Sequence, residues 1–412
     1  MKVIVAHPGK QHSYRLATAV KKNGDLYKYI TTIYNKDTSY IYKLMNCFLG
    51  SDNKERAKKR KCEYLDDNEV IQFNKCLGII ILFLVRIPIF NRLYNFANLI
   101  MANSFGKKVA NYAIKHNVDM VIMYDTNAAK CFKILKSKAP NIKRVLDASI
   151  ANRIYTKELY ENILEEKYLK NMKEQDYFLW EKKYIKSYKD EIKYTEYVLC
   201  ASDFVKDSYI YSGVDENKIF LLPYGTNFSC KEYFPRKIKD KVDFLFVGQF
   251  SLRKGITYLL KSIENIENAN LHIVGFYDVN SNLYKKYSKN NNIKFYGQLL
   301  QNEVRDIMQK CDVYVFPSLC EGMSLSCLEA MSCGLPLIVT KNSGVSNLMN
   351  NNGFIINAGD DAEISNAMMK FISNRELINK LGEKSYKLSL NYTWLEYEKN
   401  LSNILGIIGE NK

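Results

Sequence analysis

The sequence predicts an α/β protein made of two doubly wound domains that face each other across a cleft. Short apolar runs alternate with longer helical patterns along the chain, and this alternation occurs twice, on either side of a segment, 227–240, that shows neither pattern. The runs are apolar throughout rather than alternating, which is typical of parallel strands covered on both faces. Consecutive strands are therefore expected to be joined by right-handed helical crossovers.

Each half of the chain has its own set of expected strands. In the first half they are Val3–Ala6, Asp119–Tyr124, Lys143–Asp147, Tyr197–Ala201 and Ile219–Pro223. In the second half they are Asp243–Gly248, Asn270–Gly275, Ile293–Tyr296, Asp312–Pro317 and Leu335–Thr340. Helices are expected between most of them, for example over Ile256–Ile266 and Glu303–Lys310, and the charged stretch Tyr160–Tyr194 predicts one or two surface helices.

Charge is concentrated in the first part of the chain, which has 412 residues and a net charge of +16. Residues 1–150 hold 26 Lys and Arg against 11 Asp and Glu, whereas the remainder holds 34 against 33. A basic face suits anionic lipids, anionic polymers or phosphorylated small molecules, and a solvated basic surface without any partner is the alternative. The balance of 47% hydrophobic and 25% charged residues excludes a disordered chain.

The thiols and the N-terminus indicate a cytoplasmic protein. The ten cysteines are dispersed with no C-x-x-C pair, so neither a disulfide framework nor a zinc site is expected. The first strand starts at once, without the apolar core of a signal peptide. The longest apolar run, Leu77–Val85, is shorter than the ~20 residues of a membrane-spanning helix. Because the basic cluster Lys54–Lys61 precedes this run, the segment 54–90 predicts either contact with a membrane surface or a plain core element.

A loop and helix in the second half carry the strongest motif. The strand that ends at Pro317 is followed by Glu321 and Gly322, and a helix is expected from about Ser324 to Gly334 with Glu329 inside it. The amides at the start of this helix would form an anion site; they belong to Gly322, Met323, Ser324 and Leu325. A carboxylate on the loop and another on the helix could then bind the hydroxyls of a polyol, with a diphosphate between them.

A second motif follows the strand that ends at Gly248. Arg253 and Lys254 come just before Gly255, where a helix begins. Two cations beside a helix N-terminus would neutralise a diphosphate.

Taken together, these two motifs resemble the retaining glycosyltransferases of family 4, which have the GT-B fold of two Rossmann-like domains. The resemblance rests on the E-x7-E signature from Glu321 to Glu329 and on the Gly–Arg-Lys-Gly loop, and it extends from about Lys218 to Trp394. It implies an N-terminal acceptor-side domain over 1–230, a C-terminal nucleotide-sugar domain over 231–392, and a last helix over 393–412 that crosses back to the first domain.

The resemblance also implies a role for each site residue. Glu329 would bind the ribose hydroxyls, Glu321 the transferred sugar, and Arg253 and Lys254 the diphosphate that leaves. Loop amides would line the sugar and phosphate, and three further positions would contribute to the donor site near the phosphate and the base: Gly248, Gly275 and Tyr296. The family needs no divalent metal, so neither a metal nor another cofactor is expected beside the donor. Where the family usually has Arg after the loop glycine, this chain has Gln249.

The acceptor side is expected in the first domain, at the ends of its strands. Gly9 would let the backbone approach a donor phosphate, and the polar candidates beside it are Lys10, His12, Asp125 and Asp147. The expected activity is transfer of a hexose with retention, from a nucleotide sugar to a glycan or a lipid-linked glycan of a surface polysaccharide, at the inner face of the membrane. The alternative is a catalytically silent nucleotide-sugar-binding subunit; a nucleic-acid partner is not expected, because no RNA signature or helix-turn-helix is present.

Overall fold

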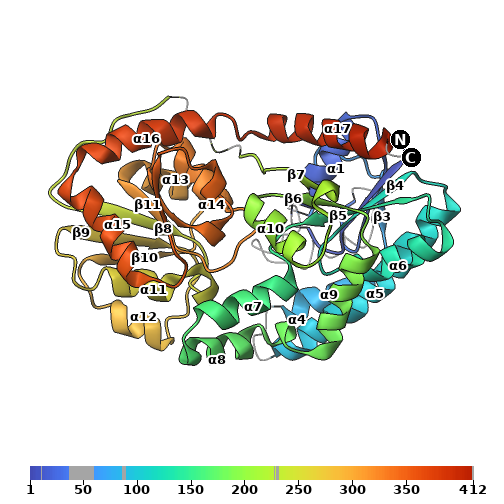
Figure 1. Ribbon diagram of the computed structural model, residues 1–412, viewed down its shortest axis with the longest axis horizontal. Coiled ribbons are helices and arrows are strands. Elements are labelled where there is room, and N and C mark those ends of the chain that lie inside the picture. Colours follow the sequence, from blue (N-terminus) through green and yellow to red (C-terminus); the bar gives the residue numbers. More distant parts are fainter. Residues whose placement is uncertain (11, 37–59, 86–89, 227, 229–231, 411–412) are drawn as a thin grey trace.

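Two parallel sheets, one in each half of the chain, form the protein and confirm the predicted fold class. The structure is a computed structural model that describes residues 1–10, 12–36, 60–85, 90–226, 228 and 232–410. Figure 1 shows the two lobes side by side, with the N-terminal sheet on the right and the C-terminal sheet on the left. The basic cluster Lys54–Lys61 lies almost wholly outside the described residues.

The N-terminal sheet has seven parallel strands in the order β3-β2-β1-β4-β5-β6-β7. The strands are β1 Val3–Ala6, β2 Leu26–Thr31, β3 Val70–Gln72, β4 Met120–Tyr124, β5 Lys143–Ala148, β6 Tyr197–Cys200 and β7 Ile219–Leu221. The helices are α1 Ser13–Lys22, α4 Lys75–Leu84, α5 Asn91–Lys115, α6 Ala129–Lys138, α7 Arg153–Ile163, α8 Glu166–Gln175, α9 Lys182–Tyr194 and α10 Asp203–Tyr211. Every residue of β1, β4 and β6 is buried, as expected for strands covered on both faces.

The C-terminal sheet has six parallel strands in the order β10-β9-β8-β11-β12-β13. The strands are β8 Val242–Val247, β9 Ala269–Val274, β10 Ile293–Gly297, β11 Val313–Phe316, β12 Leu337–Thr340 and β13 Gly353–Ile356. The helices are α11 Ile256–Ser262, α12 Asn282–Tyr287, α13 Gln301–Lys310, α14 Leu325–Ser332, α15 Asp361–Ser373, α16 Glu376–Ser389 and α17 Trp394–Glu410. In both sheets the strand order reverses beside the first strand, and ligands of such sheets bind beyond the carboxyl ends of the strands at this point.

The structure corrects the prediction of one or two surface helices over Tyr160–Tyr194. The stretch contains the end of α7, all of α8 and all of α9, with a 3-10 turn over Tyr177–Leu179 between the last two. Its spaced aromatic residues are buried rather than exposed; they are Tyr160, Tyr184 and Tyr188. Helix α8 also reaches the C-terminal lobe, where the ring of Tyr168 lies 5.7 Å from that of Tyr258 on α11.

Two connections between the lobes lie against each other. The amide of Thr226 donates a hydrogen bond of 3.0 Å to the carbonyl of Tyr392, and a Cβ atom at Gly225 would lie 2.2 Å from the backbone of Thr393. Beyond this point α17 runs along α1 of the N-terminal lobe (Figure 1). Lys22 of α1 forms an ion pair of 2.8 Å with Glu398 of α17.

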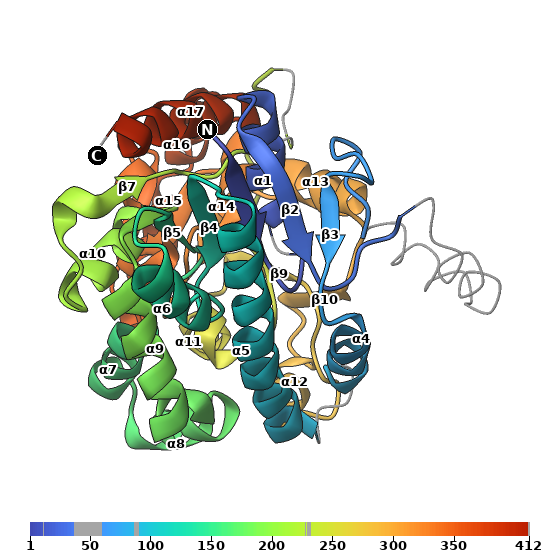
Figure 2. The ribbon, with the colours of Figure 1, turned by 90° about the vertical axis from the view of Figure 1, so that its right-hand side faces the viewer.

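A patch of exposed apolar side chains covers α4 and the start of α5, which lie side by side in Figure 2. We call this the α4–α5 patch, and its members are Ile79, Ile80, Phe83, Val85, Phe90, Leu93, Phe96 and Ile100. Phe83 is the most exposed of them, at 62%. None of the helices in the described ranges combines the length and the apolar character needed to cross a bilayer.

Candidate active site

The carboxylate of Glu321 lies between two cations. One of its oxygens, Oε1, is 2.6 Å from Nζ of Lys254 and 2.7 Å from Nη1 of Arg253. It also accepts a hydrogen bond of 3.1 Å from the hydroxyl of Ser318. The Glu321 side chain is buried, and the cations that were predicted for the diphosphate are thus already paired with the carboxylate predicted for the sugar.

Backbone contacts hold the two loops of this cluster together. The carbonyl of Arg253 accepts hydrogen bonds from the amide of Leu319 at 2.8 Å and from the hydroxyl of Ser318 at 3.0 Å. In return, Nη1 of Arg253 donates to the carbonyl of Cys320 at 3.0 Å. These loops follow β8 and β11, which are neighbours in the sheet. The pairing of adjacent parallel strands therefore brings together residues that are nearly 70 positions apart in the sequence.

The cluster shifts the acidity of both cations. Burial and the like charge of Arg253 lower the pKa of Lys254, and Glu321 opposes that shift. Burial is the largest influence on Arg253 and acts to lower its pKa, but Glu321, Tyr160 and Cys320 together outweigh burial and the pKa is raised. Both side chains therefore sit in a poorly solvated environment, where an added anion would be attracted strongly.

Glu329 has different partners from Glu321. It lies half-buried on α14 and accepts a hydrogen bond of 3.5 Å from Nε2 of Gln301. Burial raises the pKa of its carboxyl, while Gln301 and the nearby Arg305 oppose the rise. The carboxylate is therefore only weakly engaged within the protein and keeps the capacity to accept hydrogen bonds.

The start of α14 meets the N-terminal lobe. The carbonyl of Gly322 accepts a hydrogen bond of 2.6 Å from the hydroxyl of Ser202, and a Cβ atom at Gly322 would lie 2.0 Å from the carbonyl oxygen of Ser149. Among the described residues, none accepts a hydrogen bond from the four amides predicted to form the anion site; they belong to Gly322, Met323, Ser324 and Leu325. Unpaired amides at a helix N-terminus are suited to an anion.

The other donor-side candidates lie at the ends of β8, β9 and β10. The amide of Gly248 donates to the carbonyl of Val274 at 2.9 Å, and the amide of Gly275 donates to the carbonyl of Gly297 at 2.8 Å. The hydroxyl of Tyr296 lies 2.8 Å from Nδ1 of His272. Gln249, which replaces the usual arginine, is exposed.

The acceptor-side candidates do not form one group. His12 lies with Nε2 3.1 Å from Oδ2 of Asp147 and 3.2 Å from the hydroxyl of Tyr224, so two of the predicted residues do meet. Asp125 instead accepts a hydrogen bond of 3.1 Å from the amide of Ser149. Burial raises the pKa of the Asp125 carboxyl, whereas the positive charge of the nearby Arg153 guanidinium acts to lower that pKa.

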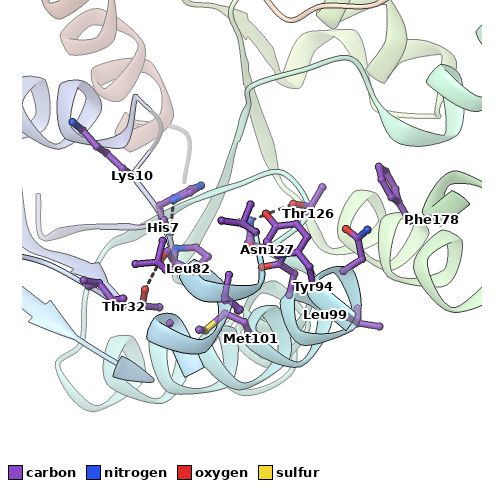
Figure 3. Close-up of a pocket in the computed structure, with 18 of the residues that line it drawn as sticks. His7, Lys10, Thr32, Leu82, Tyr94, Leu99, Met101, Thr126, Asn127 and Phe178 are labelled. Atoms are coloured by element: carbon purple, nitrogen blue, oxygen red, sulfur yellow. Dashed lines mark hydrogen bonds between the residues drawn. The ribbon is translucent and has the colours of Figure 1, made fainter. Parts of the chain in front are cut away.

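A cavity of about 420 Å³ opens beside these residues in the N-terminal lobe (Figure 3). It lies beyond the carboxyl ends of β1, β2 and β4, and α4 and α5 form its other wall. Of the predicted site residues, Gly9 and Lys10 line it, while the other described candidates do not. The side chain of Lys10 points away from the other labelled residues in Figure 3.

Several lining residues were missed by the sequence analysis. His7 and Asn127 line the cavity from the loops after β1 and β4, and Arg153 lines it from the first turn of α7. Their positions just after predicted strands would have singled them out. The loop after β4 is held by Glu191 of α9, whose carboxylate accepts hydrogen bonds of 2.9 Å from the amides of Thr126 and Ala128.

The described residues contain no group of three or more His, Cys, Asp and Glu side chains placed to hold a metal ion. Separately, the cluster offers electrostatic stabilisation from two half-buried cations, unpaired helix amides and two carboxylates.

The architecture is the GT-B fold, in which two Rossmann-like lobes face each other. Residues 231–388 match the model of the family described as "Glycosyl transferases group 1". A solved structure of similar fold is the sucrose-phosphate synthase of Thermosynechococcus elongatus, with a TM-score of 0.65, 16% identity and 99% of each chain covered. Another is HepE of Anabaena in complex with UDP-glucose, with a TM-score of 0.60, 14% identity and coverage of 99% of this chain and 100% of that one.

Among curated proteins, the chain is similar to an Escherichia coli enzyme named UDP-Gal:alpha-D-GlcNAc-diphosphoundecaprenol alpha-1,3-galactosyltransferase. The two are 32% identical over 185 residues, which are 42% of this chain and 47% of the relative. The chain spans about half the length of the first curated relatives it matches.

Proposed function

We propose that the protein is a retaining glycosyltransferase that moves a hexose from a nucleotide-diphospho-sugar to a glycan or lipid-linked glycan acceptor. The observation that carries the proposal is the cluster of the buried Glu321 with the half-buried Arg253 and Lys254, beside the unpaired amides of α14 and within the region that matches the family. The UDP-glucose complex of a structural neighbour supports a nucleotide sugar as donor.

In the proposed reaction, Arg253 and Lys254 hold the diphosphate while Glu321 orients the sugar and Glu329 accepts hydrogen bonds from the ribose. The amides of α14 stabilise the negative charge that grows on the leaving diphosphate. The acceptor hydroxyl attacks from the side on which the diphosphate leaves, and a phosphate oxygen takes its proton. No metal takes part, because two cations and the helix amides supply the positive charge.

The α4–α5 patch is proposed to rest on the cytoplasmic face of a membrane. Eight exposed apolar side chains on two adjacent helices and their caps, in a basic half of the chain, have the composition of an interfacial surface. The acceptor of the Escherichia coli relative carries a diphosphoundecaprenol group, which supports a lipid-linked acceptor. The protein then acts in the synthesis of a surface polysaccharide.

Donor binding tests the proposal. A screen of nucleotide sugars by thermal shift should identify one that raises the unfolding temperature, and Glu329→Ala should weaken that ligand about tenfold or more, since a hydrogen bond to a charged group contributes about 1.5–3 kcal/mol. Glu267→Ala, which removes an exposed glutamate from the turn before β9, is the control and should leave the affinity unchanged. If no nucleotide sugar is bound, the proposal is wrong.

A catalytically silent nucleotide-sugar-binding subunit is the second candidate, favoured by the exposed Gln249 in place of arginine. Binding of a donor without hydrolysis or transfer by the purified protein would select it over the enzyme.

A further inference from the structure

Arg153, the first residue of α7, carries a half-buried guanidinium that donates no hydrogen bond to any described residue. Its Nε atom is buried without a partner, and the ring of Phe178 lies 5.7 Å from its guanidinium carbon. An arginine side chain holds its N–H donors in a fixed planar fork, and leaving such donors unsatisfied in a protein interior is costly. The side chain therefore has the capacity to bind a ligand.

The residues on either side of Arg153 contact the loop that precedes α14 in the other lobe. The carbonyl oxygen of Ser149 is so close to Gly322 that a Cβ atom added there would lie 2.0 Å from it. The hydroxyl of Thr156 lies 3.7 Å from Sγ of Cys320. Arg153 lies in the sequence between these two points of contact, so the start of α7 is held against this loop of the C-terminal lobe.

This contact brings Arg153 to the sugar end of the proposed donor site. Glu321 belongs to the same loop, and in the proposed reaction it orients the transferred sugar. Arg253 and Lys254 are paired with Glu321 and hold the diphosphate in that reaction. Arg153 and Arg253, which belong to opposite lobes, repel each other electrostatically. The transferred sugar, rather than the diphosphate, is therefore the part of the donor that lies toward Arg153.

The space in front of Arg153 offers positive charge to a ligand. The cavity that it lines is also lined by Lys10 and Arg60, and the described part of the chain contributes no aspartate or glutamate to that lining. Asp125 and Asp176 act on Arg153 electrostatically from outside the lining, but neither forms an ion pair with it among the residues described. An anionic group on a ligand would therefore meet a cation that has no partner.

We propose that the sugar moved by this protein is a hexuronic acid, and that its carboxylate binds Arg153. The planar fork of a guanidinium fits the two oxygens of a carboxylate, so this pair is stronger and more specific than a contact with a neutral hydroxyl. The donor then spans the two lobes, with its diphosphate on Arg253 and Lys254 and its carboxylate on Arg153. This inference rests on the proposed function and names the class of its donor sugar.

The test titrates two matched pairs of donors calorimetrically into the full chain: UDP-glucuronate with UDP-glucose, and GDP-mannuronate with GDP-mannose. Within each pair the ligands differ only at C6 of the sugar. We expect the uronate of one pair to bind about tenfold or more tightly than its neutral partner. Equal or tighter binding of the neutral sugar overturns the uronate assignment and leaves the proposed function intact. Binding of none of the four also overturns the assignment, and the wider screen of nucleotide sugars then decides the proposed function.

Arg153→Gln should remove the preference, because it should weaken the uronate about tenfold or more and leave the neutral sugar almost unchanged. Arg92→Gln is the matched control, since Arg92 also stacks on an aromatic ring, that of Tyr177 at 5.6 Å, but lies outside the cavity lining. It should keep the full preference. If Arg153→Gln does not fold, Arg153→Lys, which loses the planar fork, should still reduce the preference. An unaltered preference in the folded Arg153 variant overturns the assignment.

Discussion

Substitution of Gly322 by alanine should slow sugar transfer while leaving the binding of the nucleotide almost unchanged. The added Cβ would lie 2.0 Å from the carbonyl oxygen of Ser149 and 2.8 Å from its carbon, whereas ordinary contact begins at 3.4 Å. The atoms are therefore 1.4 Å too close. Because Ser149 contributes backbone atoms from the opposite lobe, no change of rotamer can relieve the overlap, and the lobes must separate at the start of α14.

A misplacement of about 1 Å can lower a rate about 100-fold. We therefore expect Gly322→Ala to lower kcat by about that factor, with little change in the affinity for the nucleotide alone, since the phosphate loops belong to one lobe. Steady-state kinetics would give kcat, a nucleotide titration would give the affinity, and small-angle scattering should show a more open molecule.

Gly406→Ala is the matched control, because a Cβ atom at Gly406 on α17 would meet nothing within 4 Å. It should leave kcat unchanged. If Gly322→Ala showed the kcat and the scattering profile of the parent protein, the contact across the cleft would not matter for the reaction and the reasoning would be refuted.

Three further predictions follow from the site and its surroundings. Lys254→Gln removes the charge beside Glu321 and should lower kcat about 10–100-fold, more than it raises the KM of the donor; equal kcat in the variant and the parent would remove Lys254 from the mechanism. Burial raises the pKa of the Glu191 carboxyl from 4.5 to about 8, so between these pH values the folded protein keeps a proton that the unfolded chain releases, and stability falls as pH rises. That fall is at most about 5 kcal/mol. Glu191→Gln should flatten it in thermal unfolding measured from pH 5 to 8, and an unchanged slope would contradict the prediction. Phe83→Ser in the α4–α5 patch should reduce sedimentation with anionic vesicles, while Leu300→Ser, an equally exposed change on the other lobe, should not; equal sedimentation of the two variants would argue against membrane contact.

Most of the strands that the sequence analysis located are largely buried, although it also located β7 and β10, which lie at sheet edges and have mixed burial. The strands it missed have mixed burial: β2 contains Lys28 and is only half covered, β3 has three residues, and β13 lies at the edge of its sheet. An uninterrupted apolar run arises only where both faces are covered, so strands at the margins leave a weaker signal.

The donor-side motifs were local and could be found residue by residue. Their mutual contact was not predictable, because the ion pairs of Glu321 with Arg253 and Lys254 depend on the adjacency of β8 and β11. The cavity was harder still, since its lining comes from several separate segments of the N-terminal half. No single stretch of sequence contains enough of that lining to reveal it.

The paired connections between the lobes determine how the lobes can move relative to each other. Gly225 and Thr393 are in contact, so the two connections between the lobes act together as a single hinge. The lobes then move by rotation about that hinge rather than by translation, and the displacement grows with distance from the hinge. The contact of Tyr168 with Tyr258, which is remote in sequence from both connections, should break early in such a swing. A larger residue at Gly225 would clash with the backbone at Thr393 and restrict the rotation of the lobes, without contacting any residue that binds a substrate.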